Sequence, residues 1–146
     1  MATKRRTDAA DEGFSAEEKA AMKERAAELK RSRRSKDPEA DVLAKIDEME
    51  GDDKVIAESL HDLVKKVAPE MGCKTWYGFP SYTVGKQIIF FYQPAKKFGT
   101  RYGTLGFNDQ AQLDDGDMWP SAYAIQTWTA AVEKRVTELI TRAVGA

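Results

Sequence analysis

The fold of this chain is decided by residues 74–92, which read KTWYGFPSYTVGKQIIFFY. Seven of these residues are aromatic, and the stretch is interrupted by turn-forming residues at Gly78, Pro80 and Gly85. It follows a helical pattern that ends at Ala68 and Pro69. Aromatic and β-branched residues between turn formers are typical of strands, so we predict that a β-meander begins here.

The meander is expected to continue toward the C-terminus. We predict strands at Thr75–Tyr77, Ser81–Val84, Gln87–Gln93 and Arg101–Phe107, a loop at 94–99, and a last strand at Ser121–Ile125. In Gln87–Gln93 both alternating sets of side chains are apolar. A strand of that kind lies in the middle of a sheet, with helices covering one of its faces.

Helices are expected on both sides of the meander. Ser15 and Glu18 form a capping box ahead of an Ala/Glu/Lys/Arg-rich run to about Arg34, whose thin apolar stripe, Met22 and Leu29, predicts weak packing. Later helices are predicted from Asp37–Pro38, after Gly51–Asp53 and after Thr129. We therefore predict an α+β fold: an antiparallel sheet of about four to five strands with helices packed on one face, plus an N-terminal helical extension.

Charge divides the chain into two parts. Residues 1–36 hold eleven Lys and Arg against seven Asp and Glu, whereas residues 37–146 hold twelve against seventeen. We predict a basic extension at 1–36, disordered at 1–13, and one α+β domain at 37–146. A single cysteine, Cys73, excludes an internal disulfide and favours a reducing compartment. The longest apolar run, Ile88–Tyr92, is far shorter than the roughly 20 residues of a membrane span, so we expect a cytoplasmic protein without membrane contact.

Several of these elements together resemble a known family. They are a helix pair, Tyr77-Gly78-Phe79-Pro80-Ser81-Tyr82 matching a Y-G-x-P-x-Y signature, the strand Ile88–Tyr92, a strand ending Thr104-Leu105-Gly106-Phe107, and an amphipathic closing helix. Over roughly residues 39–145 this order resembles the YdhG-like family of small bacterial domains in the YjbR/CyaY-like superfamily. The resemblance implies a compact α+β fold and, for some members, a frataxin-like iron-chaperone role. Most members have no established activity.

One helix carries candidate metal ligands. Glu58, His61 and Asp62 are spaced i, i+3 and i+4, which places them on one helix face. An imidazole nitrogen and two carboxylates suit Fe²⁺ or Zn²⁺ at an open site. The alternative, which the sequence favours, is that these residues form the solvated face of an amphipathic helix. Together with the frataxin-like role that the resemblance implies, these candidate ligands give the first functional hypothesis, an iron-binding chaperone.

The aromatic residues provide a second hypothesis, a module without catalysis that recognises a small molecule or a protein partner. Its candidate ligand-binding residues are Trp76, Tyr77, Phe79, Pro80, Tyr82, Arg101 and Tyr102. The alternative is that most of these rings simply fill the core.

Catalysis and nucleic-acid binding find little support. The sequence contains no phosphate-binding glycine motif and no C-x-x-C pair, and nothing in the spacing brings Cys73 and His61 together. The cationic run Lys30–Lys36 predicts weak, non-specific contact with phosphates, so we do not expect a nucleic-acid partner. The helix predicted within 15–36 is instead a candidate surface for a protein partner.

Overall fold

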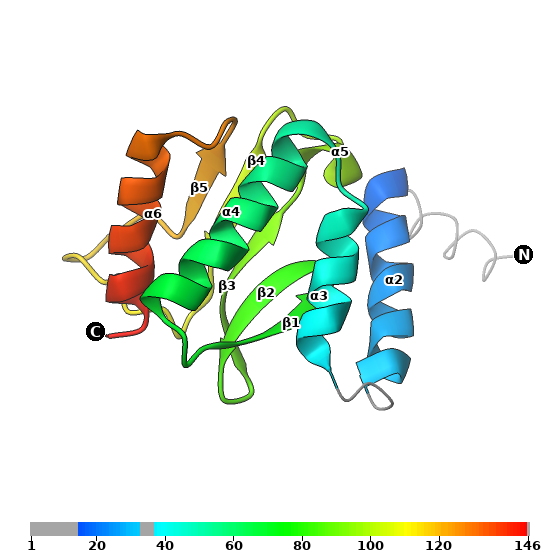
Figure 1. Cartoon of the computed structure of the whole chain (residues 1–146), viewed down its shortest axis with the longest axis horizontal. Coiled ribbons are helices and arrows are strands. Elements are labelled where there is room, and N and C mark those ends of the chain that lie inside the picture. Colours follow the sequence, from blue (N-terminus) through cyan, green and yellow to red (C-terminus); the bar gives the residue numbers. More distant parts are fainter. Residues whose placement is uncertain (1–14, 33–36, 146) are drawn as a thin grey trace, which may run out of the picture.

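An antiparallel sheet of five strands forms the centre of the molecule, in the order β1-β2-β3-β4-β5 (Figure 1). The computed structural model describes residues 15–32 and 37–145. Its strands are β1 (Gly72–Trp76), β2 (Phe79–Val84), β3 (Gln87–Gln93), β4 (Gly103–Phe107) and β5 (Ala122–Ile125). Its helices are α2 (Ala16–Ser32), α3 (Pro38–Asp47), α4 (Gly51–Val67), α5 (Ala95–Phe98) and α6 (Ala130–Ala143). The predicted α+β fold with an antiparallel sheet is confirmed.

The hydrophobic core lies between the sheet and the helices α3, α4 and α6. Figure 1 shows α4 and α6 lying across one face of the sheet, with α3 beside them toward β1. Phe90 and Tyr92 of β3 pair with Phe107 and Leu105 of β4, and all four are buried in this core. The helices contribute buried apolar residues at helical spacing: Val42 and Ile46, Ile56, Leu60 and Val64, and Val136, Leu139 and Ile140. The prediction that β3 is central is therefore confirmed.

At three of the predicted helix starts, the expected side chain accepts a hydrogen bond from a helix amide. The Asp37 side chain accepts from the Ala40 amide at 3.1 Å, ahead of Pro38 at the first helical position. Thr129 Oγ1 accepts from the Val132 amide at 3.2 Å, and Ser15 Oγ accepts from the Glu18 amide at 3.0 Å. These contacts satisfy helix amides that have no partner within the helix.

Helix α2 packs on the domain through side chains other than its predicted apolar stripe. Met22 and Leu29, its predicted apolar stripe, are 41% and 47% exposed, whereas Ala21 and Glu28 are 4% and 3% exposed. The helix therefore packs on the domain through a face of small and acidic residues. Figure 1 shows it beside α3, at the β1 side of the molecule.

The segment 94–99, predicted as a loop, contains the short helix α5. Its first amides, those of Ala95 and Lys96, donate to the Asp53 carboxylate of α4 at 2.8 and 3.1 Å. A residue about forty positions earlier thus supplies the N-terminal cap, which a local sequence pattern does not reveal.

No helix among residues 15–32 and 37–145 has both the length and the apolar character needed to cross a bilayer. The disorder predicted for residues 1–13 lies outside the described residues, as does the end of the cationic run at 33–36.

Candidate functional site

The turn between β1 and β2 has an unusual backbone. Trp76 pairs with Phe79, so the turn has two central residues, Tyr77 with φ of 51° and Gly78 with φ of 78°. Two positive φ values are those of a type I′ hairpin turn, whose first central position prefers Asn, Asp or Gly. Tyr77 is the only non-glycine residue with positive φ in the described part of the chain. A bulky residue in this conformation is strained, which indicates that the surroundings hold its ring in place.

Helix α2 lies against this turn. The Gly78 amide donates to Glu28 Oε1, and the Arg25 guanidinium lies 5.9 Å from the centre of the Tyr77 ring. A Cβ atom at Gly78 would collide with Lys97 Nζ and with the Glu24 carboxylate. The positive φ is the main reason for glycine at this position, because the Lys97 and Glu24 side chains that a Cβ atom would meet are flexible at their ends.

A groove with aromatic walls opens between α2, the β1–β2 hairpin, β3 and α5. We call this cavity, of about 360 Å³, the aromatic groove; it is lined by Glu18, Ala21, Met22, Trp76, Tyr77, Phe79, Phe91, Gln93 and Phe98. Trp76 lies edge-on to Phe91, with ring centres 5.2 Å apart, and Phe79 lies 5.7 Å from Phe98. Five rings from four elements thus form one cluster outside the main core. Its volume falls at the lower end of the range of small-ligand pockets.

The position of Phe91 depends on a glycine of the neighbouring strand. Phe91 pairs with Gly106, and a Cβ atom at Gly106 would collide with the Phe91 ring. The ring therefore lies over the bare backbone of β4. This close contact leaves no room for a side chain at position 106.

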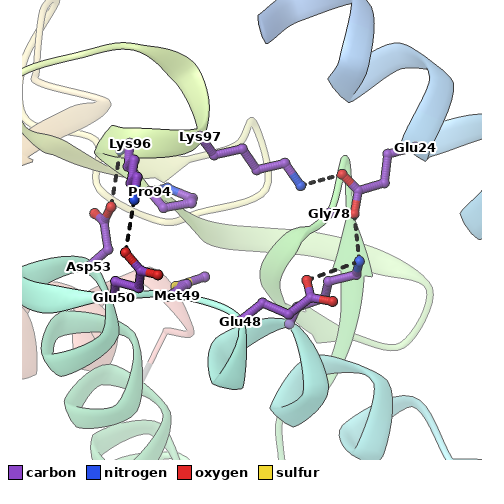
Figure 2. A pocket seen from close by; sticks show the side chains of 10 residues that line it. Glu24, Glu48, Met49, Glu50, Asp53, Gly78, Pro94, Lys96 and Lys97 are labelled. Carbon is purple, nitrogen blue, oxygen red and sulfur yellow. Dashed lines mark hydrogen bonds and ion pairs between the residues drawn. The ribbon is translucent and has the colours of Figure 1, made fainter.

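A second cavity also borders α2 and the turn, and Figure 2 shows its side chains. We call it the charged pocket; it has about 330 Å³ and is lined by Glu24, Lys45, Glu48, Met49, Glu50, Asp53, Gly78, Pro94, Lys96 and Lys97. Its charges pair with one another, as the dashed lines in Figure 2 indicate: Glu24 with Lys45 at 2.8 Å and with Lys97, and Lys96 with Glu50 at 2.8 Å. The pocket therefore presents little unpaired charge to a ligand.

Glu24 is the centre of this ion-pair network. Partial burial raises the pKa of the Glu24 carboxyl, but hydrogen bonds from Lys45 and Lys97 outweigh it, so that the pKa lies below its ordinary value of 4.5. Since Lys45 belongs to α3 and Lys97 to α5, one carboxylate connects α2 to two elements of the domain.

The candidate ligand-binding residues fall in three places. Trp76, Tyr77 and Phe79 line the aromatic groove. Pro80 and Tyr82 are fully buried and line no part of it. Arg101 and Tyr102 line a separate cavity of about 250 Å³ near the first turn of α4, where the guanidinium lies 5.3 Å from the Tyr102 ring centre. The structure thus brings three of the seven together.

The candidate metal ligands do not form a group. Glu58 and Asp62 are exposed, but His61 is only 6% exposed and both of its ring nitrogens have partners, Tyr82 Oη at 3.0 Å and Glu39 Oε2 at 3.2 Å. Across residues 15–32 and 37–145 no group of three or more His, Cys, Asp or Glu is placed to hold a metal ion. The expectation that His61 shares an open helix face with the two carboxylates is therefore wrong, because its ring points into the core.

The partners of the His61 ring select its tautomer. A hydrogen bond from Lys65 is the main reason that the pKa of Glu39 lies below its ordinary value, so the carboxylate is ionised and only accepts. Nε2 of His61 therefore donates to Glu39, and Nδ1 accepts from the Tyr82 hydroxyl. Burial raises the pKa of Tyr82 well above its ordinary value, which keeps that hydroxyl a donor.

The surroundings of the single cysteine disfavour its reactive form, although Lys65 acts in the opposite direction. Burial is the main cause that raises the pKa of the Cys73 thiol above its ordinary value, which disfavours the nucleophilic thiolate. The ring nitrogens of His61 bond to Tyr82 and Glu39 and not to this thiol.

Sequence reasoning missed six contributors to the aromatic groove: Glu18, Ala21, Met22, Phe91, Gln93 and Phe98. One signal was present in α2, where Glu17, Ala21, Glu24 and Glu28 recur at helical spacing, i, i+4, i+7 and i+11. This row marks the face that packs on the domain. It was overlooked because packing faces are usually sought as apolar stripes.

Known proteins provide no assignment for this site. Comparison of the chain with protein-family models, with curated proteins and with solved structures gave no match. The resemblance to the YdhG-like family therefore stays a prediction based on the Tyr77–Tyr82 signature and the order of the elements.

Proposed function

We propose that this protein is a small-molecule recognition module whose binding site is the aromatic groove, and that it works by binding without catalysis. The observation that carries the proposal is the cluster of five rings around a cavity of about 360 Å³. Four of these rings, Trp76, Tyr77, Phe91 and Phe98, are partly exposed. Rings that only filled the core would be buried, as Phe90 and Tyr92 are.

The strained backbone at Tyr77 supports the same site. An Asn in this turn would avoid a cost of about 1–2 kcal/mol, yet the chain has a large aromatic residue there. Strain of this kind is typical of functional positions, where the orientation of one side chain matters more than stability. The Tyr77 ring contacts both Trp76 and Phe79, with ring centres 5.2 and 6.3 Å apart, and so completes the wall of the groove.

The iron-chaperone hypothesis has less geometric support. Its only imidazole, that of His61, already bonds to Tyr82 and Glu39, and its two carboxylates are exposed on α4. A cytoplasmic location forms part of our proposal as well; the single Cys73 supports it.

The test uses benzyl alcohol as a neutral aromatic probe and follows the indole N–H resonances of the three tryptophans. We expect the Trp76 resonance to shift in a saturable manner, and that of Trp119, which lies in an exposed stretch outside the groove, to stay in place. Phe98→Ala, which removes one ring of the wall, should weaken binding about tenfold.

A matched control separates this function from the metal hypothesis. The double variant Glu58→Ala with Asp62→Ala removes two exposed carboxylates outside the groove and should bind the probe as the wild type does. A Trp76 resonance that does not move up to the solubility limit of the probe would refute the proposed function.

A further inference from the structure

We propose that the ligand of the aromatic groove is a small organic cation of the quaternary or methylated ammonium class. This inference rests on the proposed function and names the class of ligand. It follows from the charge and the ring geometry of the groove, which are independent of its volume.

Glu18 is the first element of the argument. Among the described residues that line the groove it is the only charged one, and Gln93 is the only other one with a charged or amide side chain. The Glu18 side chain is exposed, and its carboxylate makes no ion pair with the described lysines and arginines. The carboxylate is thus available to a cation at the rim, while an anionic ligand would be repelled by it.

The rings supply the second element. The face of an aromatic ring carries partial negative charge and attracts a cation within about 6 Å of the ring centre, most strongly over Trp and Tyr. Trp76 contacts Tyr77 and Phe91 with ring planes inclined at 59° and 73°. Rings whose planes are inclined to one another present their faces in different directions, as the surroundings of a tetrahedral ammonium group require, and the stacked pair Tyr77–Phe79, with planes 26° apart, adds a further wall.

One of these rings, that of Tyr77, already contacts a cationic side chain of the chain itself. The Arg25 guanidinium lies 5.9 Å from the Tyr77 ring centre. Its charge is offset by Glu28, whose Oε2 lies 3.7 Å from Arg25 Nη1, so Arg25 adds little repulsion to an incoming cation. Bulky methylated ammonium groups also suit a groove with few hydrogen-bonding partners, because they have few or no N–H donors to satisfy.

The experiment compares choline with 3,3-dimethylbutan-1-ol, its neutral carbon analogue of nearly the same shape, by isothermal titration calorimetry and by the Trp76 indole resonance. We expect choline to bind about tenfold more tightly than the neutral analogue. Glu18→Gln should reduce choline binding about threefold to tenfold and leave the neutral analogue unchanged. Glu133→Gln, at an exposed carboxylate on α6 outside the groove, is the matched control and should change neither.

The outcomes separate this inference from the function on which it rests. Equal binding of the two compounds, or choline binding that Glu18→Gln does not reduce, would overturn the cation class while the groove remains a binding site. If neither choline nor its neutral analogue binds while benzyl alcohol still shifts the Trp76 resonance, the cation class is also overturned and the groove remains a binding site. Failure of all three compounds would overturn the proposed function together with this inference.

Discussion

The Tyr92 hydroxyl donates a hydrogen bond to Asp53 Oδ1 across 2.7 Å, which connects the central strand β3 to the first turn of α4. The same carboxylate accepts from the amides of Ala95 and Lys96 at the start of α5. Burial first, and the hydrogen bond to Asp53 second, raise the pKa of Tyr92 far above its ordinary value, so that the phenol stays a donor. One buried carboxylate therefore positions α5, and with it Phe98 of the aromatic groove.

This arrangement predicts a graded loss of stability. Tyr92→Phe removes one hydrogen bond, and because Asp53 keeps its two amide donors we expect a loss of about 1 kcal/mol. Asp53→Ala leaves the Tyr92 hydroxyl and the two α5 amides without this acceptor, so its loss should reach about 3 kcal/mol. Urea unfolding measures both. Asp52→Ala, an exposed neighbour in the same turn, is the control and should cost about 0.5 kcal/mol through the helix dipole alone. Equal losses at Asp52 and Asp53 would contradict this account.

The same contacts explain which parts of the fold the sequence predicted. The strands and the helices α3, α4 and α6 are indicated by local signals: alternating apolar residues, caps at Asp37 and Thr129, and glycine turns. Helix α5 has no such signal. It has four residues, and its cap, Asp53, comes from another helix. Contacts between residues distant in sequence were therefore the part that pattern reasoning could not supply.

Two substitutions at Tyr77 separate the effect of backbone strain on stability from the effect of the ring on binding. Tyr77→Ala and Tyr77→Asn both remove the ring, so both should weaken binding of benzyl alcohol to a similar extent. Only asparagine adopts the left-handed backbone readily, so we expect Tyr77→Asn to be about 1 kcal/mol more stable than Tyr77→Ala. Thermal unfolding of the two variants measures this difference. If the alanine variant is equally stable, the backbone at Tyr77 carries no strain.

Docking of α2 should depend on pH through Glu24. The pKa of this carboxyl is lower in the folded protein than its ordinary value of 4.5, so its contribution to stability is complete above 4.5 and is lost as the pH falls through the lowered value. Lys45 and Lys97 face it, and Glu48 shares Lys45. Amide hydrogen exchange of α2 in the wild type and in Glu24→Gln measures the effect. We expect protection in the wild type to exceed that in the variant above pH 4.5, and the two to converge as the pH falls through the lowered pKa of Glu24.

Added salt checks the same contacts independently. Because Glu24 is only partly buried, screening should reduce the difference between wild type and Glu24→Gln. A difference that persists unchanged in about 1 M salt and at acidic pH would indicate that α2 is held by packing at Ala21 instead.

The candidate site was harder to predict than the fold. The reason is that local sequence does not show which way two helix faces point, one on α4 and one on α2. His61 was placed on a solvated face because its helical neighbours Glu58 and Asp62 are charged. Its actual partners, Tyr82 and Glu39, are 21 and 22 residues away in the sequence. Trp76, Tyr77 and Phe79 were found because their turn is encoded locally, whereas Glu18 and Ala21 joined them through the packing of a polar helix face.

The iron hypothesis is tested best at the two exposed carboxylates. His61→Ala would break two buried hydrogen bonds and destabilise the fold whether or not iron binds, so it does not discriminate. Glu58→Ala with Asp62→Ala leaves the core intact, since both side chains are exposed. Because the ring nitrogens of His61 are already bonded, we expect anaerobic calorimetry with Fe²⁺ at tens of micromolar to give no saturable binding, in the wild type or in the double variant. Saturable binding that the double variant loses would support the iron-chaperone role, and would require His61 to turn away from Tyr82 when the metal binds.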